Sequence, residues 1–438
     1  MVETGTNFFA KGILDMQKKL WLIFIAVLFL DFPLGAQNEN WPRWRGPRND
    51  GTSTETAIAS KWSKTENVKW RLELPGAAPS TPIIWQDKIF LTSAEGSDLV
   101  FLSANTAGNI LWKKTLGSGN YQIRRDESNA ASPSPSTDGK HVWVKLGTGL
   151  LACYDFTGKE IWRFNLQERY KQFSMYHGMS SSPLLDGDRL YLQLLHTNEQ
   201  IVLALDKKTG REIWQHARKT DAREESMHSY ATPFLYRFDK QEFLIVHGAD
   251  YVTAHDLKDG QEIWRSGGLN PPDKYNPYFR FVASPSASSG LIVVPSAKNG
   301  PVLGINPKDA KGDLTGLTAN YQWKLADSTP DVPSPLIHGG LVYLCRENGV
   351  LICLDAKTGQ QYYMERTHNQ RHRASPVYAD GKIYLTATDG LVTVVKAGKN
   401  FEMIAQNNIE ERLSASPAIS GGRIYLRSYD ALYAIGGK

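Results

Sequence analysis

Short runs in which apolar and polar residues alternate recur along most of this chain. Residues 186–194 (DGDRLYLQL), 380–387 (DGKIYLTA) and 421–428 (GGRIYLRS) each begin with a turn and continue with a run rich in Tyr, Leu and Ile. Further apolar runs follow, such as residues 201–206 (IVLALD). A period of two residues predicts β-strands joined by tight turns rather than helices. The pattern therefore predicts an all-β chain.

The strands belong to a repeat that begins with a small hydroxyl residue followed by proline. Proline has no backbone N–H, so it suits the first residue of a strand. The repeat predicts eight units, each a four-stranded antiparallel meander. The eight pairs are Thr81-Pro82, Ser132-Pro133, Ser182-Pro183, Thr232-Pro233, Ser284-Pro285, Ser334-Pro335, Ser375-Pro376 and Ser416-Pro417.

A turn and an aromatic residue mark the end of each unit. The turn reads D-x-x-T-G at residues 206–210 and 355–359, with variants at 155–158 and 256–260. Glycine supplies the positive φ that such a hairpin needs. A tryptophan follows, large enough to pack between neighbouring sheets. The predicted structural anchors are Trp70, Trp112, Trp162, Trp214, Trp264 and, after an insertion, Trp323.

The two ends of the repeat region complement each other. The eighth unit lacks its tryptophan strand, and residues 68–74 (VKWRLEL) form a tryptophan strand with no unit of its own. Joining them gives eight complete sheets and leaves no open edge. We therefore predict an eight-bladed β-propeller over residues 68–438, closed by the N-terminal strand joining the last blade. An open solenoid is the alternative.

The Ser-Pro opening, the A-L-D-x-x-T-G turn and the following E-I-W resemble the pyrroloquinoline-quinone (PQQ) repeat. That resemblance implies the propeller of the quinoprotein dehydrogenases and of the non-catalytic BamB-like proteins. Residues 41–47 (WPRWRGP) also resemble an N-terminal signature of secreted bacterial members. The chain departs from the dehydrogenase pattern, because it has neither an adjacent cysteine pair nor a C-x-x-C-H haem site.

The N-terminus has the character of an export signal. Lys18 and Lys19 precede an apolar run at residues 20–30, and Leu34-Gly35-Ala36 ends it. This order is typical of a secretory signal peptide. We predict a signal peptide at residues 1–36, with Met16 as an alternative start, and an irregular extension at 37–67. Because Gln37 stands where a lipoprotein needs cysteine, we expect a periplasmic or extracellular bacterial protein that is not a lipoprotein.

Composition limits the remaining classes of protein. The chain has 438 residues, a net charge of +5 and three cysteines. This charge is too small to indicate a nucleic-acid partner, and the cysteine count excludes a disulfide-dense scaffold. A bridge between Cys345 and Cys353 stays open, since it depends on hairpin register. No second long apolar run exists, so we expect no transmembrane segment in the mature chain. We also expect a monomer.

Candidate chemistry lies in the segments that lead into the first strand of each unit. These segments should converge around the axis, and they are rich in Arg, His and Tyr, which suit carboxylates, phosphates and sugars. The alternative is a set of solvated residues that bridge blades. The candidate residues are Arg124, Arg125, Tyr176, His177, His228, Tyr230, Tyr278, Arg280, His372, Arg373 and Arg412.

The sequence contains no G-x-S-x-G, H-E-x-x-H or phosphate-loop motif. We therefore expect a non-catalytic binding scaffold that recognises a protein or an anionic or sugar ligand, with no metal and no cofactor. The cluster of His247, Asp250 and His255 is interpreted as structural. The alternatives are a PQQ-dependent dehydrogenase, which would use calcium, and a carbohydrate-binding or carbohydrate-processing propeller.

Overall fold

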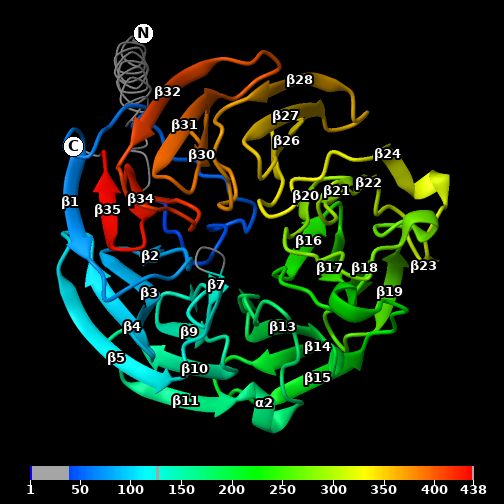
Figure 1. Cartoon of the computed structure of the whole chain (residues 1–438), viewed down its shortest axis with the longest axis horizontal. Coiled ribbons are helices and arrows are strands. Elements are labelled where there is room, and N and C mark those ends of the chain that lie inside the picture. The colour runs from blue at the N-terminus through cyan, green and yellow to red at the C-terminus, as the bar shows by residue number, and fades with distance from the viewer. Residues whose placement is uncertain (2–38, 125–127, 437–438) are drawn as a thin grey trace. The chain divides into compact units, whose positions relative to one another are not determined.

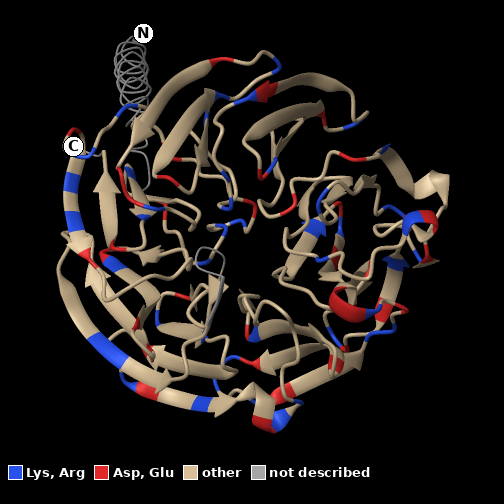
Figure 2. Cartoon of the chain, viewed as in Figure 1, with Lys and Arg blue, Asp and Glu red and all other residues tan. Residues whose placement is uncertain are grey.

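The computed structural model of the chain describes Met1 and residues 39–124 and 128–436. Apart from Met1, the predicted signal peptide lies outside these residues, as does Arg125. The chain divides into residues 1–37 and 38–438, and the described fold belongs to the second unit. Within it, eight β-sheets stand around a central axis (Figure 1). Basic and acidic residues are interspersed around this ring (Figure 2). The predicted eight-bladed β-propeller is confirmed.

The first four blades each run from the axis outward as an antiparallel meander. Blade 1 has β2 (Ile83–Trp85), β3 (Lys88–Glu95), β4 (Asp98–Asn105) and β5 (Ile110–Ser118). Blade 2 has β8 (Ser136–Thr137), β9 (His141–Lys145), β10 (Leu150–Asp155) and β11 (Glu160–Asn165). Blade 3 has β12 (Leu184–Asp186), β13 (Arg189–His196), β14 (Glu199–Asp206) and β15 (Glu212–Ala217). Blade 4 has β16 (Phe234–Phe238), β17 (Gln241–Gly248), β18 (Tyr251–His255) and β19 (Glu262–Ser266).

The other four blades repeat this order. Blade 5 has β20 (Ser286–Ser288), β21 (Leu291–Val294), β22 (Val302–Ile305) and β24 (Tyr321–Leu325). Blade 6 has β25 (Leu336–His338), β26 (Leu341–Cys345), β27 (Val350–Asp355) and β28 (Gln361–Arg366). Blade 7 has β29 (Val377–Ala379), β30 (Lys382–Thr386), β31 (Leu391–Lys396) and β32 (Met403–Asn408). Blade 8 has β33 (Ala418–Ser420), β34 (Arg423–Arg427), β35 (Ala431–Ile435) and β1 (Val68–Glu73).

The ring closes where the two ends of the repeat region meet. Strand β1 pairs antiparallel with β35, with Trp70 opposite Ala434 and Leu72 opposite Leu432. This is the predicted closure by the N-terminal strand. Smaller elements lie outside the blades: β6 (Gln122–Arg124) pairs with β7 (Ser128–Asn129), and α2 (Leu166–Arg169) follows β11. No helix among the described residues is long and apolar enough to span a membrane.

Five tryptophans dock their blade onto the next one. In these five the indole N–H donates to a carbonyl in the turn of the following blade, and the turn glycine leaves room for the ring. A Cβ on Gly260, for example, would stand 2.4 Å from Cε3 of Trp214. The pairs are Trp70 with Thr106, Trp112 with Phe156, Trp162 with Lys207, Trp214 with Leu257 and Trp323 with Ala356, at N···O distances of 2.9, 3.0, 3.0, 3.1 and 2.9 Å.

Blade 4 departs from this arrangement because blade 5 carries an insertion in place of the usual turn. Residues 306–320 separate β22 from β24 and include β23 (Gly312–Asp313). Strand β23 pairs in parallel with β19, with Gly312 opposite Trp264. Trp264 is buried, yet its Nε1 has no hydrogen-bond partner among the described residues.

A chain of hydrogen bonds links the blades around the axis. The N–H of the hydroxyl residue before proline donates to the hydroxyl of its counterpart in the next blade, at N···O distances of 2.9–3.0 Å. In blade 2 this counterpart is Ser134, not Ser132 as the repeat alignment predicts. The sequence S-P-S-P offers both registers, and the second one places the pair Ser134-Pro135 directly before β8. The Thr81 hydroxyl donates to Ser416 O at 3.3 Å and closes the circle.

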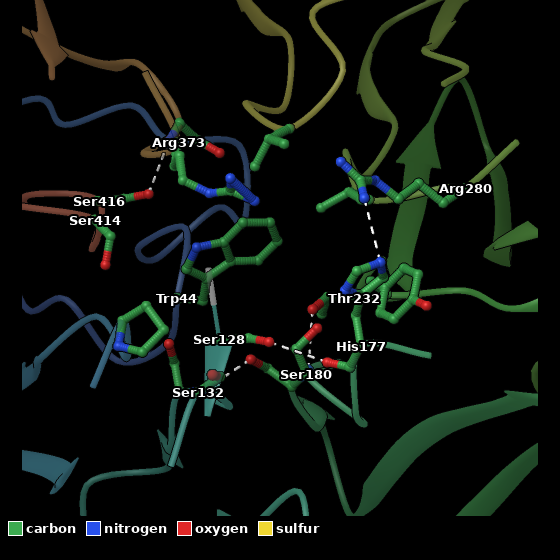
Figure 3. A pocket seen from close by; sticks show the side chains of 17 residues that line it. Trp44, Ser128, Ser132, His177, Ser180, Thr232, Arg280, Arg373, Ser414 and Ser416 are labelled. Atoms are coloured by element: carbon green, nitrogen blue, oxygen red, sulfur yellow. Dashed lines mark hydrogen bonds between the residues drawn. The ribbon is translucent and has the colours of Figure 1, made fainter. Parts of the chain in front are cut away.

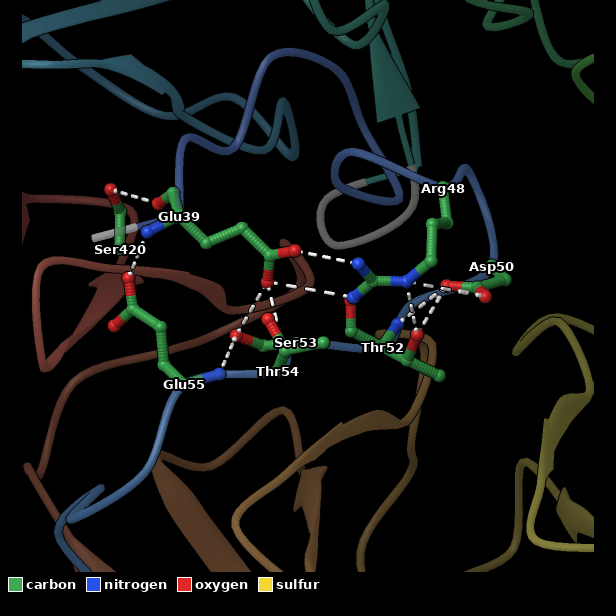
Figure 4. A network of polar contacts seen from close by, with 8 residues as sticks. All are labelled: Glu39, Arg48, Asp50, Thr52, Ser53, Thr54, Glu55 and Ser420. Atoms are coloured by element: carbon green, nitrogen blue, oxygen red, sulfur yellow. Dashed lines mark hydrogen bonds and ion pairs between the residues drawn. The ribbon is translucent and has the colours of Figure 1, made fainter. Parts of the chain in front are cut away.

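Residues 39–67 cross the propeller at the downstream ends of its innermost strands. Trp41 forms a bridge with Ile84, and Ser53 N donates to Tyr378 O at 2.8 Å. The buried Glu55 carboxylate accepts N–H groups from Gly421 and Gly422 at 2.7 and 2.6 Å. Figure 4 shows Glu55 beside an ion-pair network between this segment's own residues. Residues 39–67 therefore form a strap that is hydrogen-bonded to several blades of the ring.

The three cysteines, Cys153, Cys345 and Cys353, are buried and free. Strand register places Cys345 opposite Leu351 and Cys353 opposite Tyr343, so the two candidate partners for a bridge do not face each other. Burial raises the pKa of Cys345 to about 12. The cysteines therefore serve as small apolar side chains in the core.

Candidate functional site

A pocket of about 150 Å³ lies on the axis at the upstream ends of the innermost strands (Figure 3). Its walls combine the hydroxyls that link the blades with four longer side chains from the loops above them. The hydroxyl residues are Ser134, Ser182, Thr232, Ser375 and Ser416, and the longer side chains are His177, Tyr230, Arg280 and Arg373. The pocket is thus built by the segments that the repeat brings to the axis.

Trp44 enters this pocket from the opposite side of the ring. It belongs to the N-terminal strap, is half-buried, and lies among the serine hydroxyls in Figure 3. Its neighbour Arg45 fixes the position, because Nη2 of Arg45 donates to Pro335 O at 2.9 Å. Burial lowers the pKa of Arg45 to about 10, so the group stays charged at neutral pH. Trp44 therefore forms the floor of the pocket.

One wall of the pocket contains a linked trio of polar side chains. His177 Nε2 lies 3.2 Å from Arg280 Nη1 and 3.2 Å from Glu225 Oε1. The three residues come from different loops, which lead into blades 3, 5 and 4. Their contacts hold the Arg280 guanidinium at the pocket wall.

The facing wall contains a second polar group. Arg373 Nη1 lies 3.2 Å from Glu347 Oε1, and Arg371 Nη2 lies 2.5 Å from the same oxygen. Burial raises the pKa of Glu347, but hydrogen bonds and charge from the two arginines outweigh it, so its pKa lies below the ordinary value. Glu347 is therefore a carboxylate that orients Arg373 toward the axis.

Asp331 lies close behind this wall. It has a positive φ of 73° and is 3% exposed, and neither carboxylate oxygen has a hydrogen-bond partner among the described residues. Burial raises the pKa of Asp331 to about 6, and the nearby Glu347 adds to the rise. It lines a second cavity, of about 270 Å³, with Arg346, Glu347 and Arg371.

The structure brings four of the eleven sequence-predicted site residues to the axial pocket: His177, Tyr230, Arg280 and Arg373. Three others form a group beside it. The rings of Tyr176 and His228 are 5.3 Å apart, and those of Tyr176 and Tyr278 are 6.5 Å apart. Tyr176 and Tyr278 are exposed, whereas His228 is buried with its Nε2 2.9 Å from Thr197 Oγ1. Burial lowers the pKa of His228 to about 4.

The remaining predicted residues lie elsewhere. His372 is buried, its Nδ1 is 3.0 Å from Gln370 O, and burial lowers its pKa to about 4. The Arg412 guanidinium stacks on the ring of Tyr429 at 5.6 Å. Arg124 is part of β6, and Arg125 lies outside the described residues. That the whole set binds a ligand stays a prediction.

Sequence reasoning missed two groups that line the pocket. The Ser and Thr hydroxyls around the axis could have been found from the sequence, because a hydroxyl residue before proline occurs at the start of every blade. We interpreted this pair only as the start of a strand. Trp44 lies in the extension at residues 37–67, for which we predicted only irregular structure. Its position on the axis depends on contacts such as Arg45 with Pro335, which join residues far apart in sequence.

Whether calcium or a quinone cofactor binds stays a prediction, and two observations bear on it. No group of three or more His, Cys, Asp or Glu side chains within residues 39–124 and 128–436 is arranged to hold a metal ion. His255 instead bonds to Gly260 O and Thr253 Oγ1, at 2.9 and 2.8 Å. Pockets for small organic molecules usually measure about 300–1,000 Å³, whereas the axial pocket measures about 150 Å³.

Comparison with solved structures finds the same fold in proteins of different function. BamB from Moraxella catarrhalis matches with a TM-score of 0.58 and 16% identity, over 84% of this chain and 97% of that one. Quinohemoprotein alcohol dehydrogenase from Comamonas testosteroni matches with a TM-score of 0.65 and 12% identity, over 91% and 81%. A europium-containing methanol dehydrogenase gives a TM-score of 0.67 and 12% identity, over 90% of each chain. These identities establish the fold alone.

Comparison of the sequence itself is more specific about the family. No curated protein matches the chain. The family model described as "Outer membrane protein assembly factor BamB" matches residues 98–303 and 310–426, which cover most of the propeller. This agrees with the resemblance to the PQQ repeat, and the chain belongs to the family of BamB-type PQQ-like β-propellers.

Proposed function

We propose that this protein is an exported, non-catalytic binding propeller that recognises a carboxylate group of a protein partner in its axial pocket. The observation that carries the proposal is the convergence of Arg280, Arg373 and the ring hydroxyls on one small pocket floored by Trp44. Guanidinium groups and hydroxyls donate hydrogen bonds, and arginine forks match carboxylates in shape. The pocket is thus rich in donors suited to an anion.

The size of the pocket supports a side chain or chain terminus rather than a large free ligand. About 150 Å³ leaves room for a carboxylate and a few carbon atoms beside it. Exposed Tyr176 and Tyr278 stand next to the pocket and would contact the rest of the partner. Tyrosine is enriched at protein interfaces because its ring is apolar and its tip is polar. The assembly-factor description of the matching family also favours a protein partner.

A PQQ-dependent dehydrogenase is the less favoured function. Its support is the shared fold, which hosts unrelated functions. The small pocket and the lack of a ligand set for calcium among the described residues weigh against it. Adding calcium and the quinone to the purified protein and assaying dye reduction with alcohols and sugars tests this alternative, and clear reduction would favour it.

Calorimetric titration tests the proposed function. A short peptide rich in glutamate should bind the purified protein, and the same peptide with glutamine should not. The double variant Arg280→Gln/Arg373→Gln should lose this binding. Arg412→Gln is the matched control, because Arg412 stacks on Tyr429 outside the pocket lining. Equal binding of both peptides, or full binding by the double variant, would overturn the proposal.

A further inference from the structure

A third cavity, of about 320 Å³, lies between blades 4 and 5, away from the axial pocket. Three connecting segments converge on it. Asp221 precedes blade 4, Tyr275 lies between blades 4 and 5, and Thr315 belongs to the insertion at residues 306–320. The cavity therefore occurs where this chain departs from its own repeat, and such departures often mark functional sites.

The insertion forms one wall of the cavity. It does not supply a carbonyl for the Trp264 indole N–H, as the turn does in other blades. Leu314 N donates to Arg265 O at 2.8 Å, and Thr315 Oγ1 accepts the N–H of Gly267 at 2.7 Å. A Cβ on Gly267 would stand 2.9 Å from Cε1 of Tyr251, so only glycine allows this approach. The wall is thus built by specific contacts and has a fixed shape.

Tyrosines form the aromatic part of the lining, and their hydroxyls are already bonded. Tyr251 donates to Asp221 Oδ1 at 2.9 Å, and Tyr275 donates to Asp250 Oδ2 at 2.9 Å. The Tyr321 hydroxyl lies 2.7 Å from Ser266 Oγ. These bonds hold the rings in place, which lowers the entropic cost of binding a ligand against them.

Polar groups of both kinds complete the lining. Asp250 is buried and accepts the Asn270 amide at 3.2 Å in addition to the Tyr275 hydroxyl. An ionised carboxylate offers about four lone-pair sites, so Asp250 and Asp221 can each accept further hydrogen bonds. Lys324 supplies donors on the same cavity. The site therefore offers acceptors and donors beside aromatic rings.

Neither sign of charge dominates around the cavity, which favours a ligand without net charge. A cation would meet Lys324 in the lining and the guanidinium groups of Arg265 and Arg223, which stack on Tyr251 and Tyr275 at 4.9 and 4.5 Å. An anion would meet the two aspartates. A sugar ring has neighbouring hydroxyls that both donate and accept, and C–H faces that pack on tyrosine. We infer that this cavity is a binding site for a neutral sugar, separate from the axial pocket.

The test is a titration of the purified protein with a panel of neutral sugars, such as glucose, galactose, mannose, N-acetylglucosamine and cellobiose, followed by calorimetry. At least one sugar should bind. Asp221→Asn and Lys324→Ala should each weaken it by about tenfold, because hydrogen bonds to charged groups contribute this much. Asp309→Asn and Lys311→Ala are matched controls in the same insertion, outside the cavity lining, and should bind as the unmodified protein does.

Several results would overturn the inference. The first is that no sugar of the panel binds. The second is that Asp221→Asn and Lys324→Ala leave sugar binding unchanged. The third is that the cation tetramethylammonium binds and the sugars do not. The thermal midpoint of each variant is measured to check that it is folded. Because Lys324 is exposed, its replacement should leave the fold intact. Arg280→Gln/Arg373→Gln should retain sugar binding, so a failure at one site is distinguishable from a failure at the other.

Discussion

Trp214 and Trp264 occupy equivalent positions in neighbouring blades but differ in one hydrogen bond. The Trp214 indole N–H donates to Leu257 O at 3.1 Å, whereas Nε1 of Trp264 has no partner among the described residues. Both side chains are buried, with exposed fractions of 7% and 1%. Replacing each by phenylalanine removes one ring and the N–H from both sites. Only Trp214→Phe also removes a hydrogen bond.

The magnitudes follow from these contacts. Loss of the packing contacts of the five-membered indole ring costs about 1–2 kcal/mol at each site. The hydrogen bond adds about 1 kcal/mol to the cost of Trp214→Phe, whereas Trp264→Phe removes a buried unpaired donor whose desolvation costs about 1–3 kcal/mol. Trp214→Phe should therefore lower the free energy of unfolding by about 2–3 kcal/mol, and Trp264→Phe by less than about 1 kcal/mol.

Urea-induced unfolding measures both values. Fluorescence and far-ultraviolet circular dichroism should give coincident transitions, which is the condition for comparing free energies. Trp214→Ala is the reference for full loss of docking and should cost about 3–5 kcal/mol. Equal losses for the two phenylalanine variants, or a larger loss for Trp264→Phe, would refute the docking role of the indole N–H.

Three further predictions concern other parts of the ring. Asp331→Asn should raise the free energy of unfolding by about 2 kcal/mol at pH 7.5 and by almost nothing near pH 4. The pKa of Asp331 is raised to about 6 in the fold, so its ionisation destabilises the fold increasingly as the pH rises from about 4 to 6. Urea unfolding at both pH values measures the gain, and a gain that does not change with pH would contradict this. Glu55→Ala should cost about 2–3 kcal/mol and expose the strap to limited proteolysis, because it removes the carboxylate that accepts the N–H groups of Gly421 and Gly422. Exposed Glu66→Ala is the control. Gly260→Ala should lower the thermal midpoint more than Gly187→Ala, because both have positive φ but only Gly260 contacts a tryptophan ring; equal midpoints would count against the docking geometry.

The fold could be predicted from the sequence because its determinants are local. The signals lie within single blades: a proline at the start of a strand, a glycine turn and a tryptophan four places after it. The number of repeats then gives the number of blades. The closing strand could be identified because the last unit lacks a tryptophan strand, whereas the strand that contains Trp70 precedes the first unit and belongs to no other. The register in blade 2 was wrong because Ser132-Pro133 and Ser134-Pro135 are identical over two residues, and only the link with Thr81 across blades distinguishes them.

The candidate site was predictable only in part, because side-chain direction depends on distant contacts. His177 and His228 both precede a first strand, yet one lines the axial pocket and the other turns into the protein against Thr197. Trp44 reaches the axis through a strap that contacts several blades. The cavity between blades 4 and 5 arises from an insertion, and the repeat pattern contains no information about a segment that interrupts it.

The claim that the axial pocket binds a carboxylate is tested most directly by a crystal structure of the protein with the glutamate-rich peptide. We expect density for a carboxylate between the Arg280 and Arg373 guanidinium groups, above the Trp44 ring and within hydrogen-bond distance of the Ser/Thr hydroxyls. Peptide density at another surface, with the axial pocket unchanged, would contradict it.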